Sequence, residues 1–91
     1  MEELIRLFKK RGIFNTFQVL SLFENFRANK YMFYQKLNKF SNYNSFLRVK
    51  DALIKKKLLH VNYNNGSCYF ELTPKGKRVY FILKELNNLL K

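Results

Sequence analysis

Hydrophobic residues in the first part of the chain recur at helical spacing and predict two helices. In residues 2–11 the apolar positions that share one helical face are Leu4, Ile5, Leu7 and Phe8. Gly12 follows and is expected to end this helix. Asn15 is suited to cap the next helix, with Phe14 packed onto Val19 as a hydrophobic staple. The inward-facing residues of this second helix are expected to be Val19, Leu20, Leu22, Phe23 and Phe26.

Two further helices are predicted on either side of a short polar turn. The pattern breaks at residues 29–31 and resumes in a short third helix, whose apolar positions are Phe33, Leu37 and Phe40. The polar residues 41–44 predict a tight turn, and a fourth helix follows over residues 45–57. Its inward stripe is expected to hold Phe46, Val49 and Leu53, widened by Leu47 and Ile54. Its opposite side carries Asn44, Arg48, Asp51 and Lys55.

Two strands, residues 58–64 and 67–73, are predicted to form a hairpin. They are joined by Asn65-Gly66, a pair suited to the type I′ turn, which needs a positive φ at both positions. With this two-residue loop, the pairs on the apolar face are Leu59 with Leu72, Val61 with Phe70 and Tyr63 with Cys68. The pairs on the polar face are His60 with Glu71 and Asn62 with Tyr69. Because the register separates apolar from polar residues, it is the register that we expect.

A long closing helix is predicted to begin at Thr73-Pro74, with Thr73 as the N-cap and Pro74 in the first helical position. It extends to about Leu90, and its apolar stripe consists of Val79, Ile82, Leu83, Leu86, Leu89 and Leu90. The spacing of three and four approximates heptads, so we expect this helix to pack against a second copy of the chain. Leu4, Leu7 and Phe8 of the first helix are expected to share that dimer interface.

This order of elements resembles a winged helix-turn-helix, in which the hairpin is the wing. The resemblance extends to MarR-like and PadR-like regulators over roughly residues 16–80. The stretch SFLRVKDALIKKKLL (45–59) resembles their recognition helix and its exit, with Leu53, Lys55, Lys56 and Leu58 in matching places. LTPKGKR (72–78) is similar to the segment that closes their wing. The chain departs from these families at Lys57, where they have glycine, and at the wing tip, which lacks their Asp-x-Arg.

The resemblance implies a fold that is mainly α with a small β-hairpin wing and with extra N- and C-terminal helices. We expect a single domain over residues 1–91, divided into an N-terminal helix (1–12), the helix-turn-helix and wing (16–73) and a C-terminal helix (74–90). The small size and the abundance of Lys and Asn are also similar to winged-helix proteins of archaeal viruses and plasmids.

The charge of the chain favours a nucleic-acid partner. Of its 91 residues, 18 are Lys or Arg and six are Asp or Glu, which gives a net charge of +12. Twelve of the basic residues but only Asp51 and Glu71 among the acids lie between Arg27 and Arg78, so this part alone carries +10. Neutralising phosphates with such a surface releases counterions and predicts salt-sensitive binding.

The resemblance places the fourth helix in the DNA major groove and so assigns candidate contacts. The base-contacting candidates are Asn44, Ser45 and Arg48, of which Arg48 can pair with guanine and Asn44 with adenine. The phosphate-contacting candidates are Lys36, Lys39, Tyr43 and Lys55, while Tyr34 is either a core residue or a contact. The wing tip, Asn64, Asn65, Gly66 and Ser67, is uncharged and is expected to touch only the DNA backbone.

The same sequence offers little to catalysis, metal binding or membranes. No catalytic constellation or phosphate-binding glycine loop is found, and one cysteine, Cys68, with one histidine, His60, cannot supply a four-ligand zinc site. We therefore expect no enzyme activity, metal or cofactor. Cys68 is expected to be a packed thiol rather than half of an intermolecular disulfide. No apolar run approaches the roughly 18 residues of a membrane span, so we expect a cytoplasmic protein without a membrane partner.

The sequence thus favours a homodimeric, sequence-specific double-stranded DNA-binding protein that regulates transcription, with helix 45–57 in the major groove. Two alternatives remain. A nonspecific nucleic-acid-binding or architectural protein needs the same charge but no positioned Arg48. A winged-helix adaptor that binds another protein needs neither.

Overall fold

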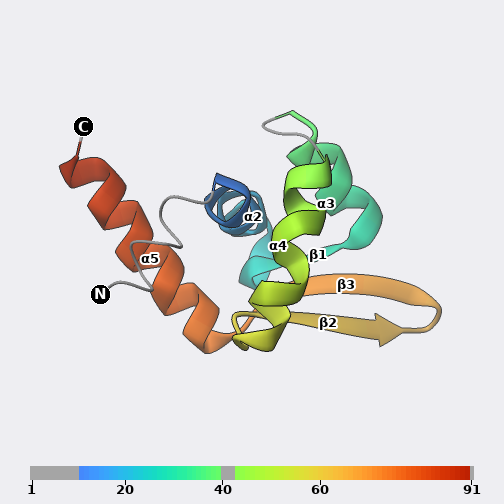
Figure 1. Ribbon diagram of the computed structural model, residues 1–91. Helices are drawn as coiled ribbons and strands as arrows, with labels where there is room; N and C mark the ends of the chain where they lie inside the picture. Colours follow the sequence, from blue (N-terminus) through green and yellow to red (C-terminus); the bar gives the residue numbers. More distant parts are fainter. Residues whose placement is uncertain (1–10, 40–42, 91) are drawn as a thin grey trace.

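Helices and a small sheet alternate along the chain in the order expected for a winged helix-turn-helix. The computed structural model describes residues 11–39 and 43–90 (Figure 1). Its elements are the helix α2 (Arg11–Ser21), the 3-10 helix η1 (Glu24–Phe26), the strand β1 (Arg27–Asn29), the helices α3 (Lys30–Leu37) and α4 (Tyr43–Lys55), the strands β2 (Leu59–Asn64) and β3 (Ser67–Leu72), and the helix α5 (Pro74–Leu89). The expected residues Leu4, Leu7, Phe8 and Phe40 lie outside the described residues.

Helix α2 already includes Gly12 and Asn15, so the predicted start of a helix after Asn15 is wrong, while residues 2–10 of the helix predicted before Gly12 lie outside the described residues. The reason is tertiary: a Cβ on Gly12 would lie 2.6 Å from the main-chain oxygen of Ser45. Gly12 therefore allows close packing of α2 on α4. The buried Thr16 donates a hydrogen bond from its Oγ1 to the Gly12 carbonyl oxygen at 2.6 Å, within the same helix.

The segment after α2 differs most from expectation. The second helix was predicted to include Phe26, but α2 ends at Ser21 and Phe26 lies in η1 with a φ of 55°. Its ring still packs inward, 5.8 Å from that of Tyr80 between centroids. Strand β1 then pairs with β3, with Ala28 opposite Phe70. Three residues are too short to show an alternating pattern, so the sequence did not reveal this strand.

The hairpin has the predicted register. Leu59 pairs with Leu72, Val61 with Phe70 and Tyr63 with Cys68, in an antiparallel three-stranded sheet of order β1-β3-β2. The turn residues have φ values of 51° at Asn65 and 80° at Gly66, as a type I′ turn requires. The Leu59–Leu72 pair at the base of the hairpin is buried, Val61 is half-buried against Phe70, and Tyr63 near the tip is 76% exposed.

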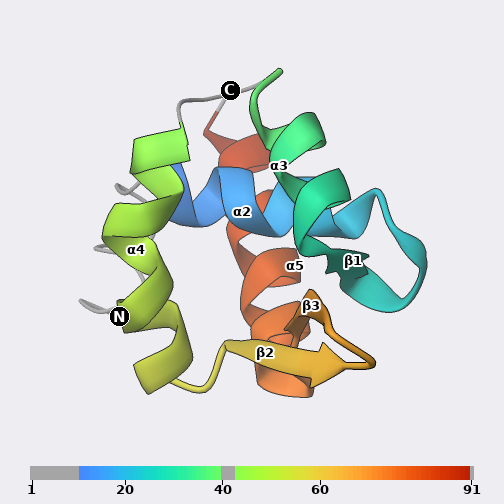
Figure 2. The same cartoon turned by 90° about the vertical axis from the view of Figure 1, so that its right-hand side faces the viewer.

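The core lies where α2, α3, α4 and α5 meet the inner face of the sheet. Its centre is an aromatic cluster of Phe33, Phe46 and Phe70, whose ring centroids lie 4.8–5.2 Å apart in edge-on or tilted arrangements. Figure 2 shows α2 crossing between α4 and α3, and α2 contacts α3, α4 and α5. The expected inward residues of α4, Phe46, Val49 and Leu53, are all buried.

Helix α5 begins as predicted and closes the core at the end of the molecule opposite the hairpin tip (Figure 1). Thr73 caps it by accepting a hydrogen bond from the Gly76 amide at 2.9 Å. Tyr80 and Leu83 face inward. Leu83 is fully buried within the monomer, so its assignment to a dimer interface is wrong. Ile82, Leu89 and Leu90 are exposed, while Val79 and Leu86 are half-buried.

Candidate nucleic-acid interface

The outer face of α4 carries the predicted reading residues. Asn44, Arg48, Asp51 and Lys55 are exposed, on the side of the helix opposite Phe46, Val49 and Leu53. The placement of Arg48 and Lys55 on one exposed face is as the sequence predicted. Ser45 is half-buried rather than exposed. It lies toward α2, because its main-chain oxygen is the atom that faces Gly12. Ser45 is therefore at the edge of this face rather than at its centre.

Two apolar residues share the outer face of α4. Leu47 is 42% exposed and Ile54 is 38% exposed, so the prediction that they widen the core stripe is wrong. Around the helix, Leu47 lies about 40° and Ile54 about 60° from Asp51, because each residue advances the helix by about 100°. The neighbouring helices and the sheet cover α4 along a narrow stripe only. The sequence could not show this, because it does not tell how wide a stripe the neighbours cover.

Two tyrosines join α3 to the start of α4. The rings of Tyr34 and Tyr43 meet edge to face with centroids 4.6 Å apart, and the Tyr43 hydroxyl donates to the Tyr34 hydroxyl at 3.4 Å. Tyr34 also packs against Phe46 and Phe70 at 6.0 Å between centroids. Burial, followed by the hydrogen bond shared with Tyr43, raises the pKa of Tyr34 above its ordinary value. Tyr34 is therefore part of the packing that orients α4.

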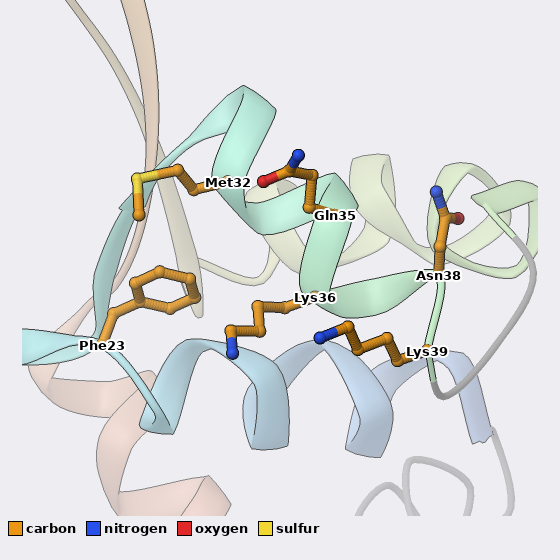
Figure 3. Close-up of a pocket in the computed structure, with 6 residues that line it drawn as sticks. All are labelled: Phe23, Met32, Gln35, Lys36, Asn38 and Lys39. Carbon is orange, nitrogen blue, oxygen red and sulfur yellow. The ribbon is translucent and has the colours of Figure 1, made fainter.

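Lys36 and Lys39 lie elsewhere. They line a hollow of about 480 Å³ above the end of α2, together with Phe23, Met32, Gln35 and Asn38 (Figure 3). Lys36 follows Tyr34 by two residues and so projects from the other flank of α3, about 200° around the helix. The structure thus does not bring Lys36 and Lys39 together with Tyr43 and Arg48. Helical spacing alone could not reveal which flank of α3 meets α4.

A second hollow, of about 420 Å³, separates the start of α3 from the hairpin tip. It is lined by Asn29, Lys30, Tyr31, Tyr34, Gly66, Ser67 and Cys68. Asn29 caps α3 by accepting a hydrogen bond from the Met32 amide at 2.8 Å. Lys30 and Tyr31 are exposed beside the wing, although sequence reasoning did not select them. The break in helical pattern at residues 29–31 was the signal that could have located this helix start.

The exit of α4 gathers basic residues from two parts of the chain. Lys55, Lys56 and Lys57 are exposed there, and Lys75 of α5 donates from its Nζ to the Lys56 carbonyl oxygen at 3.2 Å. Lys57 has a φ of 61°. The Lys57 amide bonds to the Ile54 carbonyl at 3.0 Å and the Leu58 amide to the Leu53 carbonyl at 2.9 Å. This is a Schellman motif with lysine in the position that favours glycine.

In the part of the chain that the structure describes, no three His, Cys, Asp or Glu side chains gather as a possible metal site. No helix within residues 11–39 and 43–90 is long and apolar enough to cross a membrane. Cys68 is half-buried as a free thiol and packs against the core, and His60 is exposed opposite Glu71.

No protein-family model matches the chain, and no curated protein matches it in sequence. The resemblance to MarR-like and PadR-like regulators therefore stays a prediction. Two solved structures are similar to it. Sso10a-2, a DNA-binding protein from Sulfolobus solfataricus, has a TM-score of 0.66 and 21% identity, over 85% of this chain and 78% of that one. SSV1 F-93 has a TM-score of 0.61 and 25% identity, over 86% of this chain and 92% of that one. With the observed element order and hairpin, these similarities show a mainly helical winged helix-turn-helix fold, to which α5 is added.

Proposed function

We propose that this protein is a sequence-specific double-stranded DNA-binding protein that regulates transcription as a homodimer. The observation that carries the proposal is the outer face of α4, where Arg48 and Lys55 are exposed on the helix that follows the helix-turn-helix turn. The structural similarity to Sso10a-2, which is described as a DNA-binding protein, supports the same partner. The proposed activity is binding without catalysis.

Affinity comes from the basic residues around α4. The net charge of +12 attracts a polyanion, and the lysines at the exit of α4 neutralise phosphates. Tyr43 and Lys55 keep their proposed phosphate contacts, and Lys30 beside the wing joins them. Lys36 and Lys39 contribute to the overall field only, because they line the hollow beside Phe23 rather than the outer face of α4. The exposed wing tip, residues 64–67, has no charged side chain and rests against the DNA backbone.

Specificity comes from side chains near the start of α4. Arg48 pairs through its guanidinium with guanine O6 and N7, a contact that discriminates by roughly 1–3 kcal/mol. Asn44, one turn earlier, is the proposed partner of adenine, and Ser45 lies at the edge of the reading face. Asp51 follows Arg48 by three residues and precedes Lys55 by four, so it can orient either cation.

The dimer uses the exposed apolar side of α5. Ile82, Leu89 and Leu90 are 46–73% exposed, and the half-buried Val79 and Leu86 border them. Leu4, Leu7 and Phe8 remain proposed partners from outside the described residues. A twofold pair would place the two α4 helices in successive major grooves, about 34–36 Å apart.

The test is fluorescence anisotropy with duplexes selected from a random library, compared with scrambled duplexes across a salt series. We expect binding that falls steeply with salt and favours the selected duplex by about 1,000-fold. Arg48→Ala should relax the preference at one base pair only. Its matched control, Lys55→Ala, should weaken binding to both duplexes and reduce the salt slope by about one. Equal binding to all duplexes would favour an architectural role, and no binding at low salt would favour a protein adaptor.

A further inference from the structure

Leu47 borders the reading face of α4, which Asn44, Arg48, Asp51 and Lys55 form. It is 42% exposed, and it follows Asn44 by three residues and precedes Arg48 by one. Single exposed leucines are common on protein surfaces and need no explanation. This one differs because polar and charged side chains surround it on the helix face that the proposed function places against base edges.

The major groove offers one apolar group to such a side chain. Thymine carries a C5-methyl group there, whereas the other bases present hydrogen-bond donors and acceptors. We infer that Leu47 contacts the methyl group of a thymine next to the base pair read by Arg48. This inference rests on the proposed function and adds to it a thymine-specific contact.

The position of Leu47 along α4 favours it over the second exposed apolar residue. The first turns of a recognition helix reach the base edges. Leu47 lies in the second turn, whereas Ile54 lies in the last turn beside the lysines that exit α4. Ile54 is 38% exposed, which is close to the value for Leu47. It therefore serves as a matched control of the same helix face and the same chemistry.

The basic residues around Leu47 favour DNA, rather than another protein surface, as the partner of this apolar side chain. Arg48 and Lys55 lie to one side of it around the helix, and the half-buried Lys50 lies to the other. Asp51 is the one acid of α4. The charge around Leu47 therefore suits the phosphates that line a groove.

The experiment replaces each thymine of the selected duplex, one at a time, by deoxyuridine, which pairs identically and lacks only the methyl group. Wild-type protein should bind one of these duplexes about fourfold more weakly, the factor equivalent to the ~0.8 kcal/mol of one buried methylene. Leu47→Ala should bind the thymine and deoxyuridine duplexes equally. Ile54→Ala should keep the fourfold difference. Circular dichroism checks that both variants are folded.

Two results would overturn the inference while leaving the proposed function intact. One is a selected duplex in which no thymine responds to loss of its methyl group. The other is a thymine preference that survives in Leu47→Ala. A library that yields no preferred sequence would overturn the proposed function, and the inference with it.

Discussion

The side chain of Thr73 links the start of α5 to the end of α4, through a hydrogen bond from its Oγ1 to the main-chain carbonyl oxygen of Lys57 at 2.6 Å. The Thr73 Oγ1 also accepts a hydrogen bond from the Gly76 amide at 2.9 Å, and the Thr73 amide donates to the Leu58 carbonyl at 3.1 Å. One residue thus caps α5 and fixes the exit of α4. The reading helix and the C-terminal helix are therefore held together at one point of the chain.

Thr73→Val should lower the free energy of unfolding by about 1–2 kcal/mol, because it removes the cap and leaves the Lys57 carbonyl without this donor. Urea unfolding followed by circular dichroism measures the change. Thr73→Ser keeps the hydroxyl and should lower the free energy of unfolding much less. A Thr73→Val variant as stable as wild type, or less destabilised than Thr73→Ser, would contradict the role of the hydroxyl.

Gly76→Ala should lower the free energy of unfolding by about 2 kcal/mol, although alanine favours a helix. A Cβ at Gly76 would overlap the main-chain carbonyl of Leu58, so α5 would have to move away from the segment that follows α4. Asn88→Ala, at an exposed position of the same helix, should leave stability unchanged or slightly raised. The packing argument would be contradicted if Gly76→Ala were as stable as wild type.

Lys57→Gly should raise the free energy of unfolding by roughly 0.5–1 kcal/mol. Lysine in the left-handed region is strained by about 1–2 kcal/mol, and the greater freedom of glycine in the unfolded chain offsets part of the gain. Lys55→Gly removes the same charge from a helical position and should destabilise the protein. A loss of stability in Lys57→Gly would mean that the lysine side chain stabilises the exit of α4 in another way.

Because of Tyr34, the free energy of unfolding should fall at alkaline pH. Its folded-state pKa is raised, first by burial and then by the hydrogen bond shared with Tyr43, so the folded protein disfavours the ionised form. Its contribution to stability is complete below the ordinary tyrosine pKa of about 10 and is lost as the pH rises above it.

Urea unfolding of wild type and Tyr34→Phe between pH 8 and 11 measures this effect. The difference between the two proteins should shrink above pH 10. Tyr63→Phe is the control, because Tyr63 is 76% exposed and its hydroxyl is solvated in both states. A difference that stays constant with pH would contradict the role of Tyr34 burial.

Leu89→Asp should convert the proposed dimer into a monomer. Leu89 is 73% exposed within one chain, so the substitution leaves the core untouched while adding a charge to the proposed interface. Sedimentation velocity at matched concentrations measures the change. Asn88→Asp adds the same charge at a neighbouring exposed position and should leave the dimer intact. A wild-type protein that sediments as a monomer would remove α5 from this role.

The local elements of this fold could be read from the sequence wherever one pattern was long enough. The period of α4, the cap at Thr73 and the alternation around Asn65-Gly66 each depend on residues close in the chain. The hairpin register followed, because any shift would mix its apolar and polar faces. The exposed placement of Arg48 and Lys55 followed from the helical spacing of the apolar residues of α4, which puts these two on the opposite side.

What only the tertiary structure decided is which neighbour covers each face. Gly12 stays inside a helix because Ser45 approaches it, and β1 exists because β3 offers it a partner. Leu83 belongs to the monomer core, while Leu47 faces outward. Periodicity fixes which side chains share a side of a helix, but the width of the buried stripe depends on elements distant in sequence. The pattern of residues thus determined the elements and their chemistry, and packing determined which of those residues remain on the surface.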